Sequence, residues 1–76
     1  MFERIITRPE VLGGKPCIRG TRISVDFLLD LFASGASRDD ILKAYPHLKS
    51  EDIKEAMRFA ASSMTNDLYL TADVTA

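Results

Sequence analysis

The chain has 76 residues, of which 46% are apolar and 28% charged, a composition typical of one small folded domain. Its single cysteine, Cys17, excludes an internal disulfide, and no segment approaches the roughly 20 consecutive apolar residues of a membrane-spanning helix. The net charge of −1 hides an asymmetry, because residues 1–22 carry five cations and two acids, whereas residues 23–76 carry five cations and nine acids. That distribution predicts a basic arm ahead of an acidic body.

Glycines and a proline between residues 11 and 23 exclude a helix in the first part of the chain. Within this part, Cys17-Ile18 and Arg22-Ile23 have the spacing of a tight β-hairpin that turns through Gly20 at positive φ. We therefore predict a β-hairpin arm over residues 1–23.

The first of three predicted helices is recognised by its ends and by its apolar stripe. It opens at Ser24, has Asp26 in its first turn, and ends at Gly35, which supplies the left-handed residue of a helix C-terminus. Residues at helical spacing form the stripe, and we expect all of them to face the core: Phe27, Leu28, Leu31 and Phe32, widened by Leu29.

The second and third helices are predicted from similar patterns. The second begins at Ser37, where the following Arg38-Asp39-Asp40 resembles a capping box with Asp in place of Glu, and ends before Pro46. The third begins at Ser50. Its 3.6-residue period is the clearest in the chain and is made by Ile53, Ala56, Met57, Ala60 and Met64. We therefore predict a trihelical core over residues 24–64, a pattern that a helix-turn-helix and a plain three-helix bundle share.

The last part of the chain, residues 65–76, has a different period. Apolar side chains occupy every second position, a strand pattern, at Leu68, Leu70, Ala72 and Val74. A single strand needs a partner, which is the N-terminal hairpin, a second copy or another protein. A chain of this size without a disulfide is usually supported by a partner subunit, so we expect a homodimer.

The residues whose side chains could act in catalysis or bind a metal show no pattern of a catalytic or metal site. His47 is the sole histidine and lies in the turn between two predicted helices, where a solvated side chain is the ordinary interpretation. Cys17 lies on a predicted strand and is interpreted as a core residue, because activation of a thiol requires a depressed pKa. We predict no enzymatic activity, no metal and no cofactor. Without a secretory leader in the sequence, we expect a cytoplasmic protein.

Two blocks of sequence resemble the domain of unknown function 433 family. The first runs over residues 6–23 and contains Gly-Lys-Pro followed by Arg-Gly-Thr-Arg-Ile. The second includes Ala-Ser-Gly-Ala-Ser at residues 33–37 and Ile-Leu-Lys-Ala-Tyr-Pro-His-Leu at residues 41–48. The resemblance implies a mainly α fold, with a three-helix, homeodomain-like helix-turn-helix, an N-terminal β-hairpin and, on this chain's own pattern, a short C-terminal strand.

The same resemblance implies an antitoxin, because such proteins are commonly encoded beside a small PIN-like nuclease. An antitoxin of this kind binds its own promoter DNA as a dimer, which requires cations that reach phosphates and base edges. The hairpin offers Lys15, Arg19 and Arg22, and the exposed side of the third helix offers Lys54 and Arg58. A solvated surface is the alternative interpretation of both groups. Three acidic residues beside the third helix's cations, Glu51, Asp52 and Glu55, are expected to repel the same phosphates.

Toxin binding is assigned to the C-terminal strand, which is expected to add to the edge of a partner's sheet. The residues concerned are Leu68, Tyr69, Leu70 and Val74. The same strand is equally suited to pair with the hairpin of a second copy. The alternative function is a homodimeric adaptor without a role in nucleic-acid binding, in which the basic arm contacts the acidic body of the other subunit.

Overall fold

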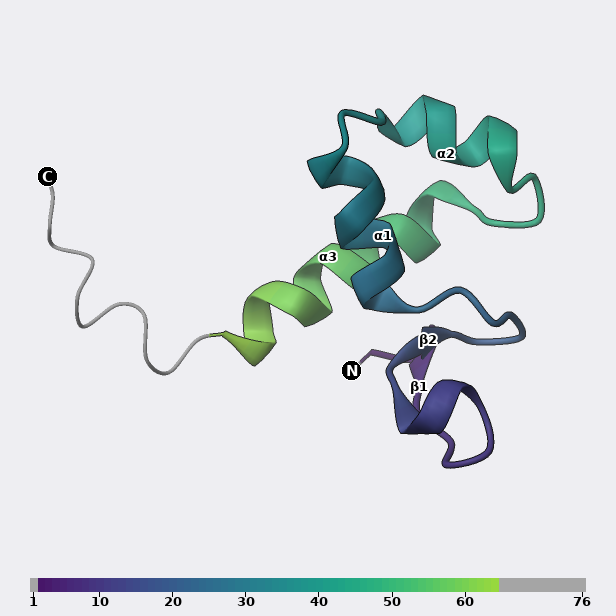
Figure 1. Cartoon of the computed structure of the whole chain (residues 1–76), viewed down its shortest axis with the longest axis vertical. Coiled ribbons are helices and arrows are strands. Elements are labelled where there is room, and N and C mark those ends of the chain that lie inside the picture. Colours follow the sequence, from purple (N-terminus) through teal and green to yellow (C-terminus); the bar gives the residue numbers. More distant parts are fainter. Residues whose placement is uncertain (1, 65–76) are drawn as a thin grey trace, which may run out of the picture.

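A computed structural model describes residues 2–64 of the chain. Its elements follow one another as β1 (Ile5–Ile6), a 3-10 turn η1 (Leu12–Gly14), β2 (Cys17–Ile18), α1 (Val25–Ala33), α2 (Arg38–Ala44) and α3 (Ser50–Ser63). The two strands lie at one end of the molecule, α2 lies at the other, and α1 crosses α3 between them (Figure 1). The predicted mainly α fold with three helices and a two-stranded N-terminal element is confirmed.

The N-terminal sheet differs in one respect from the predicted hairpin. The turn through Gly20 forms as predicted, with φ +80° at the glycine and a 2.9 Å hydrogen bond from Ile18 N to Ile23 O. The regular partner of β2, however, is β1, in an antiparallel register that places Ile5 opposite Ile18. The strand at residues 5–6 was not predicted, because two residues are too few to show an alternating pattern.

The helix ends are set by the expected polar side chains, with one shift. Ser24 caps α1 by accepting from Phe27 N, and Ser37 and Asp40 form a reciprocal capping box at the start of α2. The cap of α3 is Lys49 rather than Ser50, because Asp52 accepts a 2.8 Å hydrogen bond from the Lys49 amide. The carboxylate three residues into the helix therefore fixes its start.

The core collects apolar side chains from every part of the described chain. At its centre lie four side chains that are at most 2% exposed: Ile18, Leu28, Ile41 and Ile53. The predicted stripe of α1 was wrong at one position, since Phe27 is 38% exposed and packs its ring edge against Tyr45 at 5.9 Å between centroids. The core is completed by Ile5, Cys17, Ile23, Val25, Leu48, Ala56 and Ala60.

The N-terminal segment belongs to the same core as the helices. Ile5 and Ile18 are buried with Ile53 in one cluster, β1 contacts α3, and the ring of Phe2 packs edge-on against Phe59 at 5.3 Å. The predicted division at residue 23 thus separates segments that are packed together.

The predicted strand over residues 65–76 lies outside the described residues. Among the helices of residues 2–64, none has the length and apolarity to cross a membrane.

Burial of β1 leads to a stability prediction. We expect Ile5→Ala to lower the free energy of unfolding by about 2–5 kcal/mol in a single transition, because the smaller side chain leaves a cavity between the sheet and α3. Ile6→Ala truncates the neighbouring, partly exposed side chain and serves as the matched control, with a smaller effect. Urea unfolding of both variants measures the difference. Equal, small effects would show that the N-terminal segment is an arm outside the core.

Candidate nucleic-acid interface

The predicted cations of the N-terminal segment are exposed, but they do not gather into one surface. The first, Lys15, is engaged by the body of the protein. Its Nζ lies 3.1 Å from Asp26 Oδ2, and the two side chains are 59% and 58% exposed. Hydrogen bonds from the Ser24 hydroxyl and from Lys15 hold the pKa of Asp26 below its usual value. The ion pair is solvated, so it competes only weakly with an external anion.

Arg19 is held among acidic neighbours. Its Nε donates a 2.8 Å hydrogen bond to the carbonyl oxygen of Glu3, and its amide donates to the carbonyl of Arg4 at 2.7 Å. The side chain lines a surface hollow together with Glu3, Arg4 and Glu55. Two carboxylates therefore accompany the two guanidinium groups in this hollow. Arg19 and Arg4 also line an adjoining hollow with His47, Lys49 and Asp52, where cations outnumber acids.

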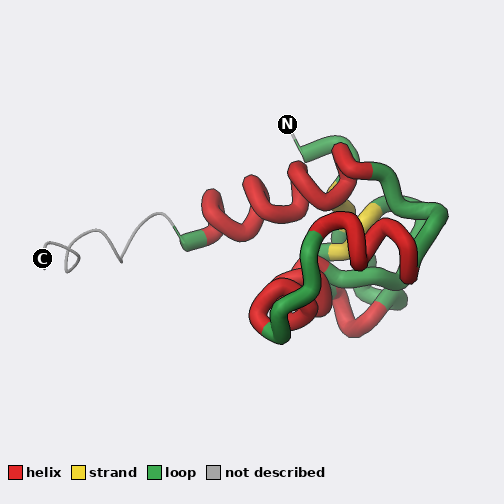
Figure 2. Tube along the Cα trace, turned by 90° about the horizontal axis from the view of Figure 1, so that it is seen from above, coloured by secondary structure: helices red, strands yellow, loops and turns green. Residues whose placement is uncertain are grey.

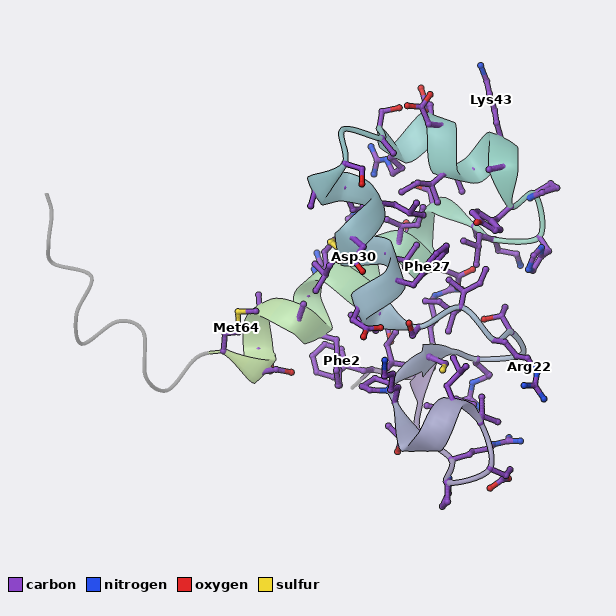
Figure 3. All side chains as sticks on the ribbon, viewed as in Figure 1. Phe2, Arg22, Phe27, Asp30, Lys43 and Met64 are labelled. Atoms are coloured by element: carbon purple, nitrogen blue, oxygen red, sulfur yellow. The ribbon has the colours of Figure 1, made fainter. Side chains whose placement is uncertain are left out.

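Arg22 points away from the body of the protein on the side of the sheet (Figure 3). It shares a second hollow with Arg8, whose other lining residues include Gly20 and Thr21. Within residues 2–64, neither arginine forms an ion pair. Lys15, Arg19 and Arg22 thus have three different surroundings, with Lys15 beside Asp26, Arg19 beside Arg4 and Lys49, and Arg22 beside Arg8.

The two cations predicted on α3 do come together, and a third joins them. Lys54 and Arg58 are exposed and four residues apart, on a side of the helix away from its buried residues Ala56 and Ala60. Arg38, from the first turn of α2, lines the same hollow, whose floor is formed by Phe32, Ile53 and Met57. We call Arg38, Lys54 and Arg58 the α3 cationic face. No acidic residue lines this hollow, and within the described chain none of the three cations is paired.

Arg38 was not among the cations predicted from the sequence, although its position in the first turn of a helix was a signal. A cation in the first turn of a helix lies at the positive end of the helix dipole, where an acidic side chain is favourable. The residues that follow it, Asp39 and Asp40, fit that rule and Arg38 does not. Such an unfavourable position is a reason to look for a role outside the helix.

The acidic residues of α3 are mostly turned away from the cationic face. Arg4 Nη1 lies 3.0 Å from Asp52 Oδ1, and the Arg4 amide donates to Glu55 Oε2 at 2.8 Å. Asp52 is only 8% exposed and is also occupied as the cap of the helix. Of the three carboxylates expected to repel phosphates, Asp52 and Glu55 are in contact with Arg4, and only Glu51 is exposed. The predicted repulsion is therefore reduced.

The candidate catalytic residues have ordinary surroundings. Cys17 is 1% exposed, as its interpretation as a core residue requires, and its thiol donates to the Lys15 carbonyl at 3.2 Å. Burial, and then the charge of Asp26, raise the pKa of the Cys17 thiol, which keeps the nucleophilic thiolate scarce. His47 is exposed. Residues 2–64 contain no group of three or more His, Cys, Asp or Glu placed to hold a metal ion.

The predicted partner-binding residues Leu68, Tyr69, Leu70 and Val74 lie outside the described residues, and their assignment stays a prediction.

A family model described as a protein of unknown function, DUF433, matches residues 5–60, from β1 through most of α3. The chain belongs to the DUF433 family. The match covers the sheet, the starts of all three helices and the α3 cationic face, and it confirms the resemblance found in the sequence.

Two relatives of this DUF433 chain are longer than it is. An uncharacterized protein, y4eO, of Sinorhizobium fredii is 36% identical over 61 residues, which cover 80% of this chain and 28% of the relative. The crystal structure of a DUF433 member from Anabaena variabilis superimposes with a TM-score of 0.76 at 36% identity, covering 78% of this chain and 58% of that one. The chain therefore spans less than two thirds of the length of either relative.

The ion pair of Lys15 can be tested directly. We expect Lys15→Met to raise the pKa of Asp26 toward that of a free carboxyl, about 3.9, measured by NMR titration. Because the folded pKa lies below the unfolded one, Asp26 stabilises the fold above about pH 4 and loses that effect as the pH falls through the folded value. Lys43→Met, on the far side of the molecule, is the control. An unchanged Asp26 titration would leave Lys15 free to bind an external phosphate.

Proposed function

We propose that this DUF433 chain is the antitoxin of a type II toxin–antitoxin pair, which binds its own promoter DNA as a dimer and neutralises a PIN-like nuclease. The observation that carries the DNA half is the α3 cationic face, where three cations from two helices line one hollow that no acidic residue lines. The toxin half rests on the family resemblance and on the apolar alternation of residues 68–74.

The arrangement of α2 and α3 suits insertion of α3 into the major groove of DNA. In a helix-turn-helix, the second helix enters the groove while the helix before it crosses the backbone. Here α3 follows α2 after a turn over residues 45–49, and its outward side carries Lys54 and Arg58. Arg38 at the start of α2 is then placed for a phosphate at the edge of the groove.

The charge balance limits where the DNA can lie. The chain as a whole carries −1, so long-range attraction to DNA is absent and binding depends on the local cationic face. Arg4 assists this arrangement, since it occupies Asp52 and Glu55 on another side of α3. Three phosphate contacts per chain, doubled in a dimer, correspond to a slope of log affinity against log salt of about −5.

A homodimeric adaptor is the second candidate function. It is favoured by the contacts that Lys15 and Arg19 make within their own chain, because these two cations of the predicted reading arm already bind the acidic residue Asp26 and a backbone carbonyl. In an adaptor, the apolar floor of the α3 hollow would receive a side chain of another protein rather than face a groove. Measuring DNA affinity against salt separates the two functions.

We expect the triple variant Arg38→Ala/Lys54→Ala/Arg58→Ala to bind upstream DNA roughly 10- to 100-fold more weakly at about 0.1 M salt, because fewer counterions are released. The salt slope should also fall in magnitude by about 0.9 for each phosphate that the variant no longer neutralises. Fluorescence anisotropy at four or more salt concentrations measures both quantities. The parent's unfolding midpoint should be retained, since all three side chains are exposed.

Lys43→Ala is the matched control for this experiment. Lys43 is an exposed cation of α2 that points away from the rest of the protein (Figure 3), so its removal changes the net charge without touching the α3 cationic face. A reduction of affinity per removed charge that is as large in Lys43→Ala as in the triple variant would indicate attraction by net charge alone. Affinity of the unmodified protein that is independent of salt would refute phosphate binding and favour the adaptor.

Removal of residues 66–76 tests the toxin half. We expect the shortened chain to fail to neutralise the PIN-like nuclease encoded beside it, because Leu68, Tyr69, Leu70 and Val74 are the predicted contacts. Growth of cells that co-express the nuclease with either form of the chain measures neutralisation. Circular dichroism should show the same helical content in both forms. Full protection by the shortened chain would contradict the assignment, as would the absence of a nuclease gene next to this one.

A further inference from the structure

An apolar groove runs along the last turns of α3, on a different side of the helix from the α3 cationic face. It lies between α3 and the start of α1, has a volume of about 200 Å³, and bears the Lys15–Asp26 ion pair on its rim. Its apolar lining consists of Pro16, Val25, Leu29, Phe59, Ala60 and Met64. We call it the α1–α3 groove. Met64, the last described residue, is 54% exposed.

We propose that residues 68–74 of a second copy of this chain fill the α1–α3 groove, and that this reciprocal exchange forms the homodimer. The proposal concerns the chain in the absence of toxin and does not rest on DNA binding. It replaces an open apolar surface by a buried one, using a segment that every copy carries.

The chain that follows Met64 is long enough to fill a groove of this size. Met64 lines the groove itself, and twelve residues follow it in the sequence. Apolar residues occupy every second position from Leu68 to Val74, so an extended chain places all four side chains on one side. At about 3.3 Å per residue, the segment spans roughly 20 Å. The groove runs from Phe59 to Met64, about 7.5 Å of helix, and so has room for two of the four side chains.

The direction of α3 favours a second copy over the same chain. The final turns of α3 project beyond the strands and the other helices (Figures 1 and 2), and Met64 at their end still lines the groove. To reach its own groove, the chain would have to reverse within residues 65–67 and run back along the same helix. In a twofold-symmetric pair of copies with antiparallel α3 helices, each segment continues forward into the groove of its partner.

Composition gives a third argument. A chain of 76 residues with one buried cysteine has no disulfide to reinforce a small core, and covering an apolar groove with a partner's segment adds buried surface. Residues 68–74 contain one acidic residue, Asp73, and no Lys or Arg. The rim carries one cation and one acid, Lys15 and Asp26, which are paired with each other, so the contact depends on the apolar side chains. A nuclease that binds the same segment would compete with this dimer contact.

Cysteine cross-linking of the full chain tests the proposal. In the double variant Leu29→Cys/Leu70→Cys, we expect mild oxidation to give a product of twice the chain mass on a non-reducing gel, with a yield that rises with protein concentration. The native Cys17 stays silent because it is 1% exposed. Leu29→Cys/Thr71→Cys is the matched control: residue 71 has the opposite parity, so its yield should be at least several-fold lower.

Each single-cysteine variant should remain uncross-linked under the same conditions. Met64→Cys/Leu70→Cys provides a second pair on an exposed position, in case Leu29→Cys perturbs the fold. An internal disulfide at the mass of one chain would overturn the exchange and show that the segment returns to its own groove. Equal yields for positions 70 and 71, or no cross-link with either pair in a folded protein, would overturn occupation of the groove altogether.

Discussion

The packing of the short N-terminal sheet against α3 is the interaction on which the rest of the structure depends. Ile5 and Ile18 face each other across the sheet and are buried in one cluster with Ile53 and Ala56 of α3. Arg4, next to Ile5, then binds Asp52 and Glu55 on the same helix. One dipeptide thus supplies both the apolar contact and the charge that fix α3, which explains how a sheet of two-residue strands holds a helix of fourteen residues.

Local chemistry made the helices predictable, and tertiary packing decided the rest. The ends of α1 and α2 follow from side chains within three or four residues, as at Ser24 and Ser37, so their caps could be inferred from sequence. The strand at residues 5–6 exists only because β2, twelve residues later, pairs with it. Phe27 has the helical spacing of a core residue, yet Val25 and Leu28 occupy the core side of α1 and leave Phe27 against Tyr45.

The candidate site was also predicted only in part, because local spacing brings some of its residues together and tertiary packing brings the others. Lys54 and Arg58 are neighbours on one helix face, and their spacing alone brings them together. Arg38 joins them through the turn between α1 and α2, a long-range contact that no local pattern encodes. Conversely, Lys15, Arg19 and Arg22 are close in sequence but separate in surroundings, because the turn at Gly20 and the contacts with Asp26 and Glu3 direct them differently.

Three sides of α3 have different surroundings, and their separation bears on the two proposals. One side binds Arg4 through Asp52 and Glu55, the outward side carries Lys54 and Arg58, and the last turns border the α1–α3 groove with Phe59, Ala60 and Met64. If a second copy occupies the groove as proposed, the cationic face stays open, so the proposed dimer and the proposed DNA contact are compatible. In that arrangement, a toxin that binds residues 68–74 would act on the dimer contact first, and on DNA affinity only through the release of the paired second copy.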